Sequence, residues 1–308
     1  MKLNQAICQN AKPKDTPSFS LVIHGGAWSS FEILRASPET YVNNLKLLLE
    51  GARQMLSNGA SALDVVEYCV RQEEDDPLHN AGRGSIPKKI DFYQMDAAIM
   101  EGATLSCGAV AGVQNVKNPI SLARLVMEKT NHVLLVDQGA MDFARTQNVD
   151  IMPDTYFDIL FLKDNQEKHG TVGAVVRDMH GNLAAGTSTG GVFGQIPGRV
   201  GDTPLIGAGT YANNQTCAIS CTGVGEDFIR ATLSHRVSML MEIAHMPLQD
   251  SMENSMAYLR DRTKGSGGMI GVDRAGKVCS AAHDTSMLHG WIEQGGRAEV
   301  SWEPSVSV

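Results

Sequence analysis

The chain contains 308 residues with a formal net charge of −8, and 43% of the residues are hydrophobic and 19% charged. This composition predicts a globular protein large enough to bury a core. The negative charge and the lack of a long basic run argue against nucleic acid or an acidic membrane surface as a partner. No run of about eighteen apolar residues occurs, so we expect no membrane-spanning helix.

The six cysteines form no C-x-x-C pair, and the nine histidines do not space into a metal site with them. The first twenty residues lack the apolar core of a secretory signal. We therefore expect reduced, mostly buried thiols, a cytoplasmic location and no cofactor for catalysis.

The first half of the chain predicts strands, helices and glycine-rich loops in alternation. Residues 19–23 predict a strand that ends at His24-Gly25-Gly26. Residues 38–58 and 61–76 predict helices, because each segment has a serine suited to the N-cap and carries an apolar stripe. Further along the chain we expect a loop at 80–85, an apolar segment at 96–113, a helix from 119, a buried strand at 132–136 and a short helix at 140–146.

The second half is organised around two predicted hairpins. Residues 150–170 show no periodicity and predict an exposed linker. Residues 170–189 and 269–282 each predict a β-hairpin, and helices over 226–244 and 247–263 separate them. Hairpins combined with helices indicate an α+β layered domain.

Small polar residues and glycines gather at predicted strand ends, in residues 187–191, 198–202 and 221–226. Taken singly, each cluster is more typical of a packed strand or a turn. Hydrolysis of an amide requires a nucleophile, a base and donors directed at the developing oxyanion. Together the clusters contain residue types that could fill these roles.

Thr171 follows Gly170 at the start of the first predicted hairpin. Inside a chain its hydroxyl has no base, but a cut before it frees an α-amine with a pKa of about 7.7–8.0, which can act as one. Glycine suits the cut because it tolerates unusual backbone angles and leaves its carbonyl open to attack. We therefore expect self-cleavage between Gly170 and Thr171.

Arg199 and Asp202 lie three residues apart in a glycine-framed loop. A guanidinium can bind a carboxylate with two parallel hydrogen bonds, and a carboxylate can hold an ammonium group. The pair predicts a clamp for a small zwitterion, although two such residues alone more often form a surface ion pair.

Several motifs occur together in a fixed order. In the first half they are His24-Gly25-Gly26, Asn80-Ala81-Gly82-x-Gly84, Asp96-Ala97, Cys107-Gly108-Ala109-Val110 and Asn118-Pro119. The second half adds Gly170-Thr171-Val172-Gly173-Ala174-Val175, Thr187-Ser188-Thr189-Gly190-Gly191, Gly198-Arg199-Val200-Gly201-Asp202 and Thr222-Gly223-x-Gly225-Glu226. In this order they resemble the plant-type L-asparaginases, also called isoaspartyl or β-aspartyl peptidases, of the N-terminal nucleophile hydrolase superfamily. The resemblance covers roughly residues 20–290.

The resemblance implies a single α+β domain with a four-layer αββα sandwich. It implies maturation by autocleavage into residues 1–170, the α subunit, and 171–308, the β subunit, and assembly into an (αβ)₂ dimer. The matching catalytic positions are the nucleophile Thr171, the tuning residue Thr189, the oxyanion-hole residues Thr222 and Gly223, and the supporting residue Asn80.

The implied substrates are L-asparagine and β-aspartyl dipeptides, small molecules held by their α-carboxylate and α-amine. The matching substrate-binding positions are Arg199, Val200, Gly201, Asp202, Thr222, Gly223, Val224 and Gly225. The family also holds a structural sodium ion with main-chain carbonyls, and oxygen ligands of this kind suit a hard cation. The matching positions are Glu73, Glu74, Asp76, His79, Ala81 and Arg83.

Three features depart from the family pattern. The linker before Thr171 is shorter than usual, which leaves the rate and extent of self-cleavage open. Trp28 stands where the family often has a small residue, and Arg83 places a cation in the loop around Asn80 that could alter sodium binding or a pocket rim.

Other functions compatible with some of these features are a glycosylasparaginase-like amidase, a threonine endopeptidase, a phosphate-binding protein and an uncut relative that binds aspartate. The first is normally exported, which the absent signal disfavours. The phosphate-binding alternative is disfavoured because the chain contains no G-x-G-x-x-G after its first strand and no G-x-x-x-x-G-K-[ST]. If the purified chain stays uncut and still binds aspartate, the last alternative, a non-catalytic relative, is the right one.

Overall fold

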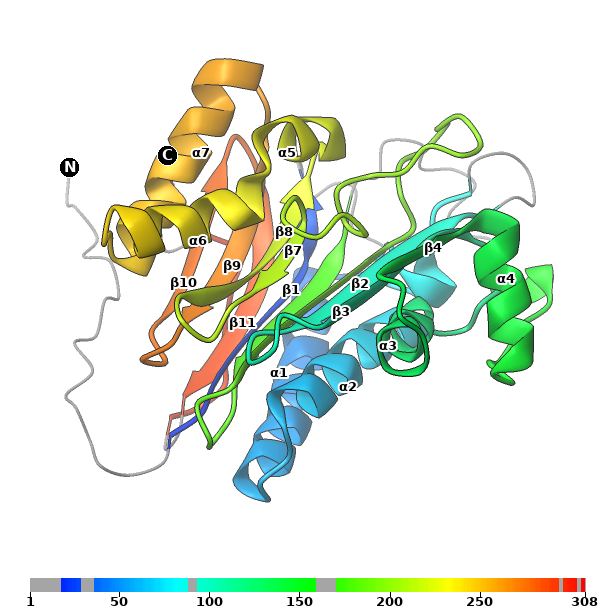
Figure 1. Cartoon of the computed structure of the whole chain (residues 1–308), viewed down its shortest axis with the longest axis horizontal. Helices are drawn as coiled ribbons and strands as arrows, with labels where there is room; N and C mark the ends of the chain where they lie inside the picture. The colour runs from blue at the N-terminus through cyan, green and yellow to red at the C-terminus, as the bar shows by residue number, and fades with distance from the viewer. Residues whose placement is uncertain are drawn as a thin grey trace.

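The computed structural model describes residues 18–28, 36–87, 93–158, 170–293, 296–303 and 306–307. The greater part of the linker expected at residues 150–170 lies outside these ranges. Within them, the chain forms two β-sheets that lie between two groups of helices (Figure 1).

The larger sheet has eight strands in the order β12-β11-β1-β5-β6-β2-β3-β4. These strands are β1 Ser20–Trp28, β2 Met95–Glu101, β3 Cys107–Val113, β4 Leu134–Val136, β5 Val172–Arg177, β6 Leu183–Thr189, β11 Ser286–Glu293 and β12 Glu299–Ser301. Strand β5 pairs antiparallel with both β1 and β6. The hairpin expected at residues 170–189 is therefore confirmed, and it lies in the middle of this sheet.

The smaller sheet has five strands in the order β13-β10-β9-β8-β7. These strands are β7 Thr210–Ala212, β8 Cys217–Gly223, β9 Gly267–Asp273, β10 Val278–His283 and β13 Val306–Ser307. Strands β9 and β10 form the second expected hairpin. Strands β5 and β6 of the larger sheet contact β8 of the smaller one, so the two sheets pack face to face.

Helices cover the outer face of each sheet. On the larger sheet lie α1 Pro38–Ser57, α2 Ala62–Asp75 and α3 Pro119–Lys129, with α4 Asp137–Thr146 beside β3 and β4. Over the smaller sheet lie α5 Gly225–Ala231, α6 Leu233–Ile243 and α7 Leu248–Thr263 (Figure 1). The order helix, sheet, sheet, helix confirms the αββα sandwich.

The first two helices begin at the serines that the sequence predicts. Ser37 Oγ accepts a hydrogen bond from the backbone N–H of Thr40 across 3.4 Å, and Pro38 opens α1. Ser61 Oγ accepts one from the backbone N–H of Asp64 across 3.2 Å. Such caps satisfy N–H groups that have no partner within the helix, so each helix starts at a defined residue.

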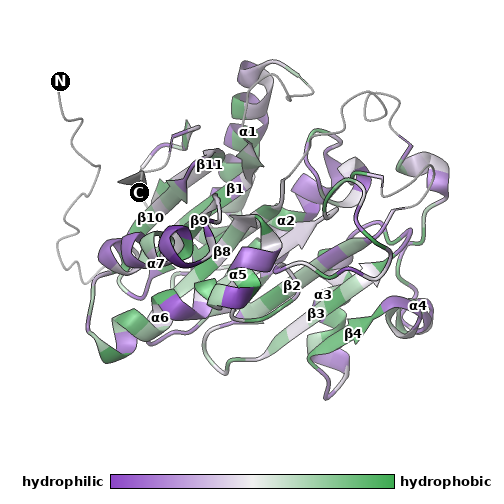
Figure 2. Cartoon of the chain, turned by 90° about the horizontal axis from the view of Figure 1, so that it is seen from above, coloured by the Kyte–Doolittle hydropathy of each residue, from purple (hydrophilic) through white to green (hydrophobic). Residues whose placement is uncertain are grey.

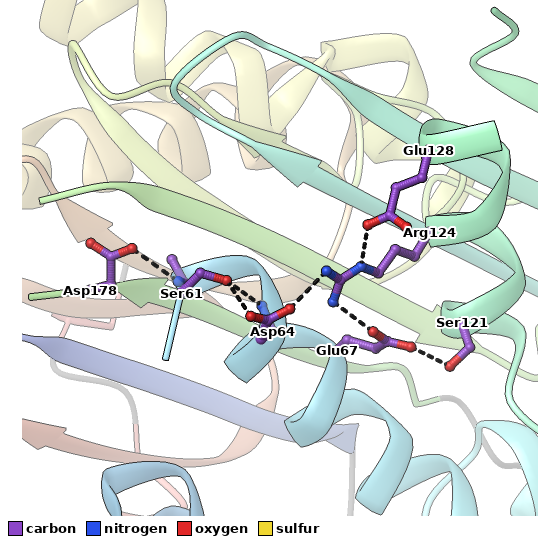
Figure 3. A network of polar contacts seen from close by, with 8 residues as sticks. Ser61, Asp64, Glu67, Ser121, Arg124, Glu128 and Asp178 are labelled. Atoms are coloured by element: carbon purple, nitrogen blue, oxygen red, sulfur yellow. Dashed lines mark hydrogen bonds and ion pairs between the residues drawn. The ribbon is translucent and has the colours of Figure 1, made fainter. Parts of the chain in front are cut away.

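A network of charged side chains joins α2 to α3 (Figure 3). Arg124 of α3 forms ion pairs with Asp64 at 2.7 Å, Glu67 at 2.8 Å and Glu128 at 2.7 Å. Glu67 also accepts a hydrogen bond from Ser121 Oγ across 2.5 Å. One cation is thus shared by three carboxylates, and this fixes the packing of the two helices on the sheet.

The buried carboxylate of Asp178 joins the start of α2 to the turn of the β5–β6 hairpin. It accepts hydrogen bonds from the backbone N–H groups of Ala62 at 3.1 Å, His180 at 2.9 Å and Asn182 at 2.9 Å. Three donors from two separate segments therefore depend on one side chain.

Three predicted elements were wrong in part. The strand expected at residues 132–136 is not buried: β4 is an edge strand, and Val136 is 50% exposed. The helix expected over 226–244 is two helices, because Thr232 adopts a left-handed backbone with φ of 48°. Strand β1 continues past His24 to Trp28 through a bulge between His24 and Gly26.

Hydrophobic residues fill the spaces between the four layers. In Figure 2 the strands carry mainly hydrophobic colours, whereas α4 is largely hydrophilic. Within the described part of the chain, the cysteines are free, and all except Cys107 are buried, as expected. Over that same part, no helix is long and apolar enough to cross a membrane.

Candidate active site

Thr171 immediately precedes β5 and is only 7% exposed. Its hydroxyl Oγ1 donates a hydrogen bond to Thr189 Oγ1 across 3.2 Å. The two threonines are brought together because β5 and β6 pair antiparallel, with Val172 opposite Ser188. The predicted nucleophile and the predicted tuning residue are therefore direct neighbours.

The carbonyl oxygen of Gly170, the residue before Thr171, is held by two side chains. Asn80 Nδ2 donates to it across 2.9 Å and Thr189 Oγ1 across 3.1 Å. Both donors point at the oxygen on which negative charge would develop if the Gly170 carbonyl carbon were attacked. These two hydrogen bonds therefore polarise the carbonyl group of the peptide bond between Gly170 and Thr171.

The side chain of Asn80 is fixed by two further hydrogen bonds. Its Nδ2 also donates to Gly191 O across 2.8 Å, and its Oδ1 accepts from the backbone N–H of Ile86 across 3.0 Å. A side chain on Gly190 would place Cβ 2.3 Å from Asn80 Oδ1, so glycine is required there. The loop that begins at Asn80 is consequently anchored on the residues that follow β6.

Thr222 and Gly223 end strand β8 close to the same peptide bond. The backbone N–H of Ala27 donates to Thr222 Oγ1 across 3.2 Å. A Cβ on the neighbouring Gly26 would lie 3.2 Å from Gly170 Cα and 3.4 Å from Thr171 N. The Gly26–Ala27 segment of β1 therefore lies against both Thr222 and the Gly170–Thr171 peptide bond. In this way β1 brings the predicted oxyanion-hole residues of the smaller sheet near the predicted nucleophile.

Arg199 is engaged by a carboxylate to which the sequence analysis gave no role. Its Nε and one Nη each donate to Glu226, both across 2.9 Å. Glu226 is half exposed, since 58% of its side chain is accessible, whereas only 16% of the Arg199 side chain is. In the sequence, the position of Glu226 directly after Gly225, a predicted substrate-binding residue, could have indicated this contact with Arg199.

Asp202 is buried, and its Oδ2 has no hydrogen-bond partner. Burial raises the pKa of this carboxyl to about 7, against the opposing effects of its own backbone N–H and the Arg199 guanidinium. A Cβ on Gly225 would lie 2.9 Å from Asp202 Oδ1 and 3.0 Å from an Arg199 Nη. The two members of the predicted clamp and Gly225 therefore lie together.

Asp96 supports the clamp loop from β2, a role that sequence reasoning missed. Its Oδ2 accepts from the backbone N–H of Gly201 across 3.4 Å, and its Oδ1 from that of Gly112 across 2.8 Å. Val200 and Gly201 lie between Arg199 and Asp202, and Val224, which is 40% exposed, precedes α5. The predicted substrate-binding positions thus cluster around the start of α5.

The residues predicted to hold sodium lie at the end of α2 and in the turn after it. Their side chains face different partners: His79 Nδ1 lies 3.1 Å from Gly25 O, and Arg83 lies over the ring of Tyr156. No group of three or more His, Cys, Asp or Glu side chains in the described ranges could hold a metal ion. Main-chain carbonyls fit better, because Pro77, four residues after Glu73, has no N–H to bond the Glu73 carbonyl.

Buried carboxyl groups belong to the first two of these positions, and burial raises the pKa of Glu73 well above its ordinary value and that of Glu74 to about 8. Both carboxylate oxygens of Glu73 and Oε2 of Glu74 are buried without a hydrogen-bond partner. A cation held by main-chain oxygens nearby would favour the charged form of these carboxyls and so lower their pKa values. The local residues are therefore compatible with a monovalent cation.

An αββα sandwich with a threonine at the head of a central strand, preceded by a polarised glycine carbonyl, defines an N-terminal nucleophile hydrolase. Comparison with known proteins narrows this class. A family model described as asparaginase matches residues 17–161 and 160–301, and the chain belongs to this family.

Three relatives are similar to this chain over nearly their whole length. An isoaspartyl peptidase of Salmonella typhimurium is 42% identical, and the match covers 88% of this chain and 94% of the relative. An isoaspartyl peptidase of Escherichia coli is 39% identical over 88% and 92% of the two chains. A probable isoaspartyl peptidase/L-asparaginase 2 of Arabidopsis thaliana is 38% identical over 92% and 99%. These matches confirm the family resemblance drawn from the motifs.

Proposed function

We propose that this chain is an autoproteolytic threonine-nucleophile amidohydrolase that converts L-asparagine to L-aspartate and ammonia and hydrolyses β-aspartyl dipeptides. One observation carries the proposal: the Gly170 carbonyl oxygen accepts hydrogen bonds from Asn80 and Thr189 while the Thr171 hydroxyl is bonded to Thr189. The relatives named for these activities support the choice of substrates.

Self-cleavage begins when Thr171 Oγ1 attacks the carbonyl carbon of Gly170. Its proton passes toward Thr189 Oγ1, the hydrogen-bond acceptor, and Asn80 stabilises the oxyanion. The C–N bond then breaks as the Thr171 nitrogen takes up the proton relayed by Thr189, which leaves an ester between Gly170 and the Thr171 oxygen. Water hydrolyses this ester, and Gly170 keeps the new carboxylate while Thr171 keeps a free hydroxyl and a free α-amine.

In the cut enzyme, the α-amine of Thr171 removes the hydroxyl proton as the oxygen attacks the side-chain carbonyl of the substrate. Thr222 and Gly223 stabilise the resulting oxyanion. The amine then returns the proton to the leaving group, which departs as ammonia or as an amino acid. Water hydrolyses the acyl-enzyme and releases aspartate.

Substrate recognition in this proposal depends on charge. The guanidinium of Arg199 binds the α-carboxylate, and Asp202 together with the Gly225 carbonyl binds the α-ammonium. Val200, Gly201 and Val224 line the site between them. Because only the leaving amine differs between asparagine and a β-aspartyl dipeptide, both substrates can use the same clamp.

The mature form is part of the same proposal. It consists of residues 1–170 and 171–308 in one domain, assembled as an (αβ)₂ dimer in the cytoplasm. The family likeness supports a structural sodium ion on the main-chain carbonyls of Glu73, Glu74, Asp76, His79, Ala81 and Arg83. When bound, this ion would make the loop that carries Asn80 more rigid. It would take no part in the catalytic steps.

Denaturing intact-mass spectrometry tests the central step. The wild-type protein should convert over days into two pieces that correspond to residues 1–170 and 171–308, while Thr171→Ala stays whole. If the wild-type chain also stays whole and still binds aspartate, the protein is a non-catalytic relative and the proposal is overturned.

A further inference from the structure

The side chain of Glu74 lies at the junction of α2, α3 and β6. Glu74 is the last residue but one of α2, and it is inaccessible to solvent. Its Oε1 accepts hydrogen bonds from Ser188 Oγ of β6 across 2.6 Å and from the backbone N–H of Ile120 in α3 across 2.9 Å. One carboxyl oxygen therefore joins α2 to the central hairpin of the larger sheet and to the start of α3.

Ser188 directly precedes Thr189, and the two side chains leave β6 on opposite faces, since successive side chains alternate along a strand. The hydroxyl of Thr189 contacts that of Thr171 on one face, across 3.2 Å. The hydroxyl of Ser188 contacts Glu74 on the other, helix-covered face. Glu74 therefore holds β6 from its helix side, one residue before the predicted tuning residue.

This anchor acts where the strand is easiest to displace. Thr189 is the last residue of β6, and the ends of secondary-structure elements open at the lowest cost in free energy. Its hydroxyl nevertheless has to stay 3.1 Å from Gly170 O and 3.2 Å from Thr171 Oγ1. A hydrogen bond that fixes Ser188 restrains the end of the strand and so preserves both distances.

The main chain of Glu74 supports the second donor to the Gly170 carbonyl, Asn80. Gly82 follows Asn80 by two residues, and a Cβ on Gly82 would lie 2.4 Å from Glu74 O and 2.6 Å from Glu74 Cβ. Gly82 also has a φ of 49°, which favours glycine. The loop of Asn80 is therefore packed directly on Glu74, and so the supports of Asn80 and of Thr189 meet at one residue.

Glu74 has a structural role as well, because it caps α3. The N-cap residue Asn118 makes no capping hydrogen bond with its side chain, and the N–H of Ile120, the second residue of the helix, is satisfied by Glu74 instead. Removal of Glu74 therefore affects folding as well as positioning. Removal of the Ser188 hydroxyl separates the two effects, because it leaves the cap and the main chain of Glu74 in place.

We propose that Glu74 is a positioning residue for the reaction at Thr171. It holds the end of β6 and the loop of Asn80 in place, so that Thr189 and Asn80 both reach the Gly170 carbonyl oxygen. Glu74 acts through these two residues and not on the reacting atoms. The proposal rests on Thr171 being the nucleophile, as proposed above.

Three variants test this role through the rate of self-cleavage, followed by intact mass. Ser188→Ala should cut about tenfold more slowly than wild type, the scale of one lost hydrogen bond. Glu74→Ala loses both hydrogen bonds and should cut about 100-fold more slowly, the scale of misplaced reacting groups. Glutamine keeps an acceptor oxygen and the shape of the carboxyl group, so Glu74→Gln should restore most of the rate that Glu74→Ala loses.

A second serine–glutamate pair on α2 provides the matched control. Glu67 accepts a hydrogen bond from Ser121 Oγ across 2.5 Å, and this pair joins α2 to α3 only (Figure 3). Ser121→Ala should therefore cut at the wild-type rate, and urea denaturation measures the loss of stability in both serine variants. Cleavage of Ser188→Ala at the rate of Ser121→Ala would overturn the proposal, as would a Glu74→Gln variant as slow as Glu74→Ala.

Steady-state kinetics of the cut molecules give a readout that lost stability does not produce. Thr189 contacts the nucleophile, whereas Arg199 and Asp202 form the substrate clamp. Ser188→Ala should therefore lower kcat for asparagine, expressed per cut molecule, by about tenfold with KM unchanged. A raised KM with unchanged kcat would overturn the inference.

The same samples distinguish this inference from the proposed function. If the wild-type protein never cuts at Thr171, the proposed function fails. If the wild-type protein cuts and Ser188→Ala cuts equally fast, the proposed function stands and Glu74 has no positioning role in it.

Discussion

Asn80 Nδ2 bridges two carbonyl oxygens, those of Gly170 at 2.9 Å and Gly191 at 2.8 Å. One amide group thereby links the bond to be cut to the segment that follows β6. An aspartate at this position could not donate to either oxygen and would place negative charge where the oxyanion forms.

Asn80→Asp should therefore slow self-cleavage about 100- to 1,000-fold, the usual effect of losing one oxyanion donor. The appearance of the two pieces by intact mass over time gives the rate. Asn254→Asp, on the exposed side of α7, is the matched control and should cut at the wild-type rate. Cleavage of Asn80→Asp at the control rate would remove Asn80 from the mechanism.

Asp202 should make ligand binding depend on pH. Its carboxyl must be ionised to hold an α-ammonium, and burial raises its pKa to about 7. Below that pH the folded protein keeps Asp202 protonated, so the affinity for L-aspartate should fall about tenfold for each pH unit. Titration calorimetry between about pH 5.5 and pH 8 measures this slope.

Asp202→Asn is the control, because it should bind aspartate weakly at every pH with no such slope. The sign for stability is opposite to that for binding. Between the ordinary pKa of 3.8 and about 7, the folded state keeps a proton that the unfolded chain has released. The Asp202 contribution to the free energy of unfolding therefore falls as the pH rises through this window. For binding, a wild-type affinity for L-aspartate that does not change with pH would refute the role of Asp202 in holding the α-ammonium.

Glu226 competes with a substrate carboxylate for Arg199. It occupies Nε and one Nη, the paired donors that a bidentate carboxylate would use. Because the ion pair is partly exposed, its loss should change binding by at most about 1 kcal/mol. Glu226→Gln should then lower KM for asparagine two- to about fivefold with kcat unchanged, as steady-state kinetics would show.

Arg199→Lys tests the other side of the pair. Lysine has no fork of parallel donors, so KM should rise by about tenfold or more while the cut at Thr171 proceeds normally. A rise in KM for Glu226→Gln would mean that Glu226 orients Arg199 instead of competing for it.

Asp178 should be important for stability, because removing it leaves three N–H donors near a buried position without an acceptor. Asp178→Ala should lower the free energy of unfolding by about 3 kcal/mol, measured by urea denaturation. Asp142→Ala removes an exposed ion pair with Arg145 and an exposed hydrogen bond from Gln138, and it should change the free energy of unfolding by less than about 1 kcal/mol. If both variants lower the free energy of unfolding equally, the hydrogen bonds of Asp178 stabilise the fold no more than exposed contacts do.

A bound sodium ion should raise the melting temperature. Dialysis against choline chloride, followed by return of NaCl at the same ionic strength, should lower and then restore Tm through mass action. Lithium or choline salts control for ionic strength alone. An unchanged Tm, together with no sodium found by elemental analysis, would exclude the ion.

The sequence predicted those helices and strands whose boundaries depend on residues close to them in the chain. Ser37 and Ser61 predicted the helix starts because capping acts within one turn, and the hairpin over residues 170–189 followed from its strands and turn. The break at Thr232 was missed because a left-handed threonine carries no composition signal.

Site geometry was predictable only where the motif order was known. Thr171, Thr189 and Asn80 lie together as the resemblance implies. The contact of Glu226 with Arg199 and that of His24 with Ser220 were missed, because pairing between residues 27 and 196 positions apart depends on how the layers pack. Likewise β4 was expected to be buried because its apolar residues do not reveal an edge.

The strand order has a consequence for assembly. A cut between Gly170 and Thr171 assigns β1, β2, β3 and β4 to one piece and β5, β6, β11 and β12 to the other, so the larger sheet is interleaved from both pieces. Neither piece can leave without exposing several unpaired strand edges at once. The two pieces should therefore stay together after the cut, and folding must precede the cut, because Asn80 of one piece and Thr189 of the other both hold the Gly170 carbonyl.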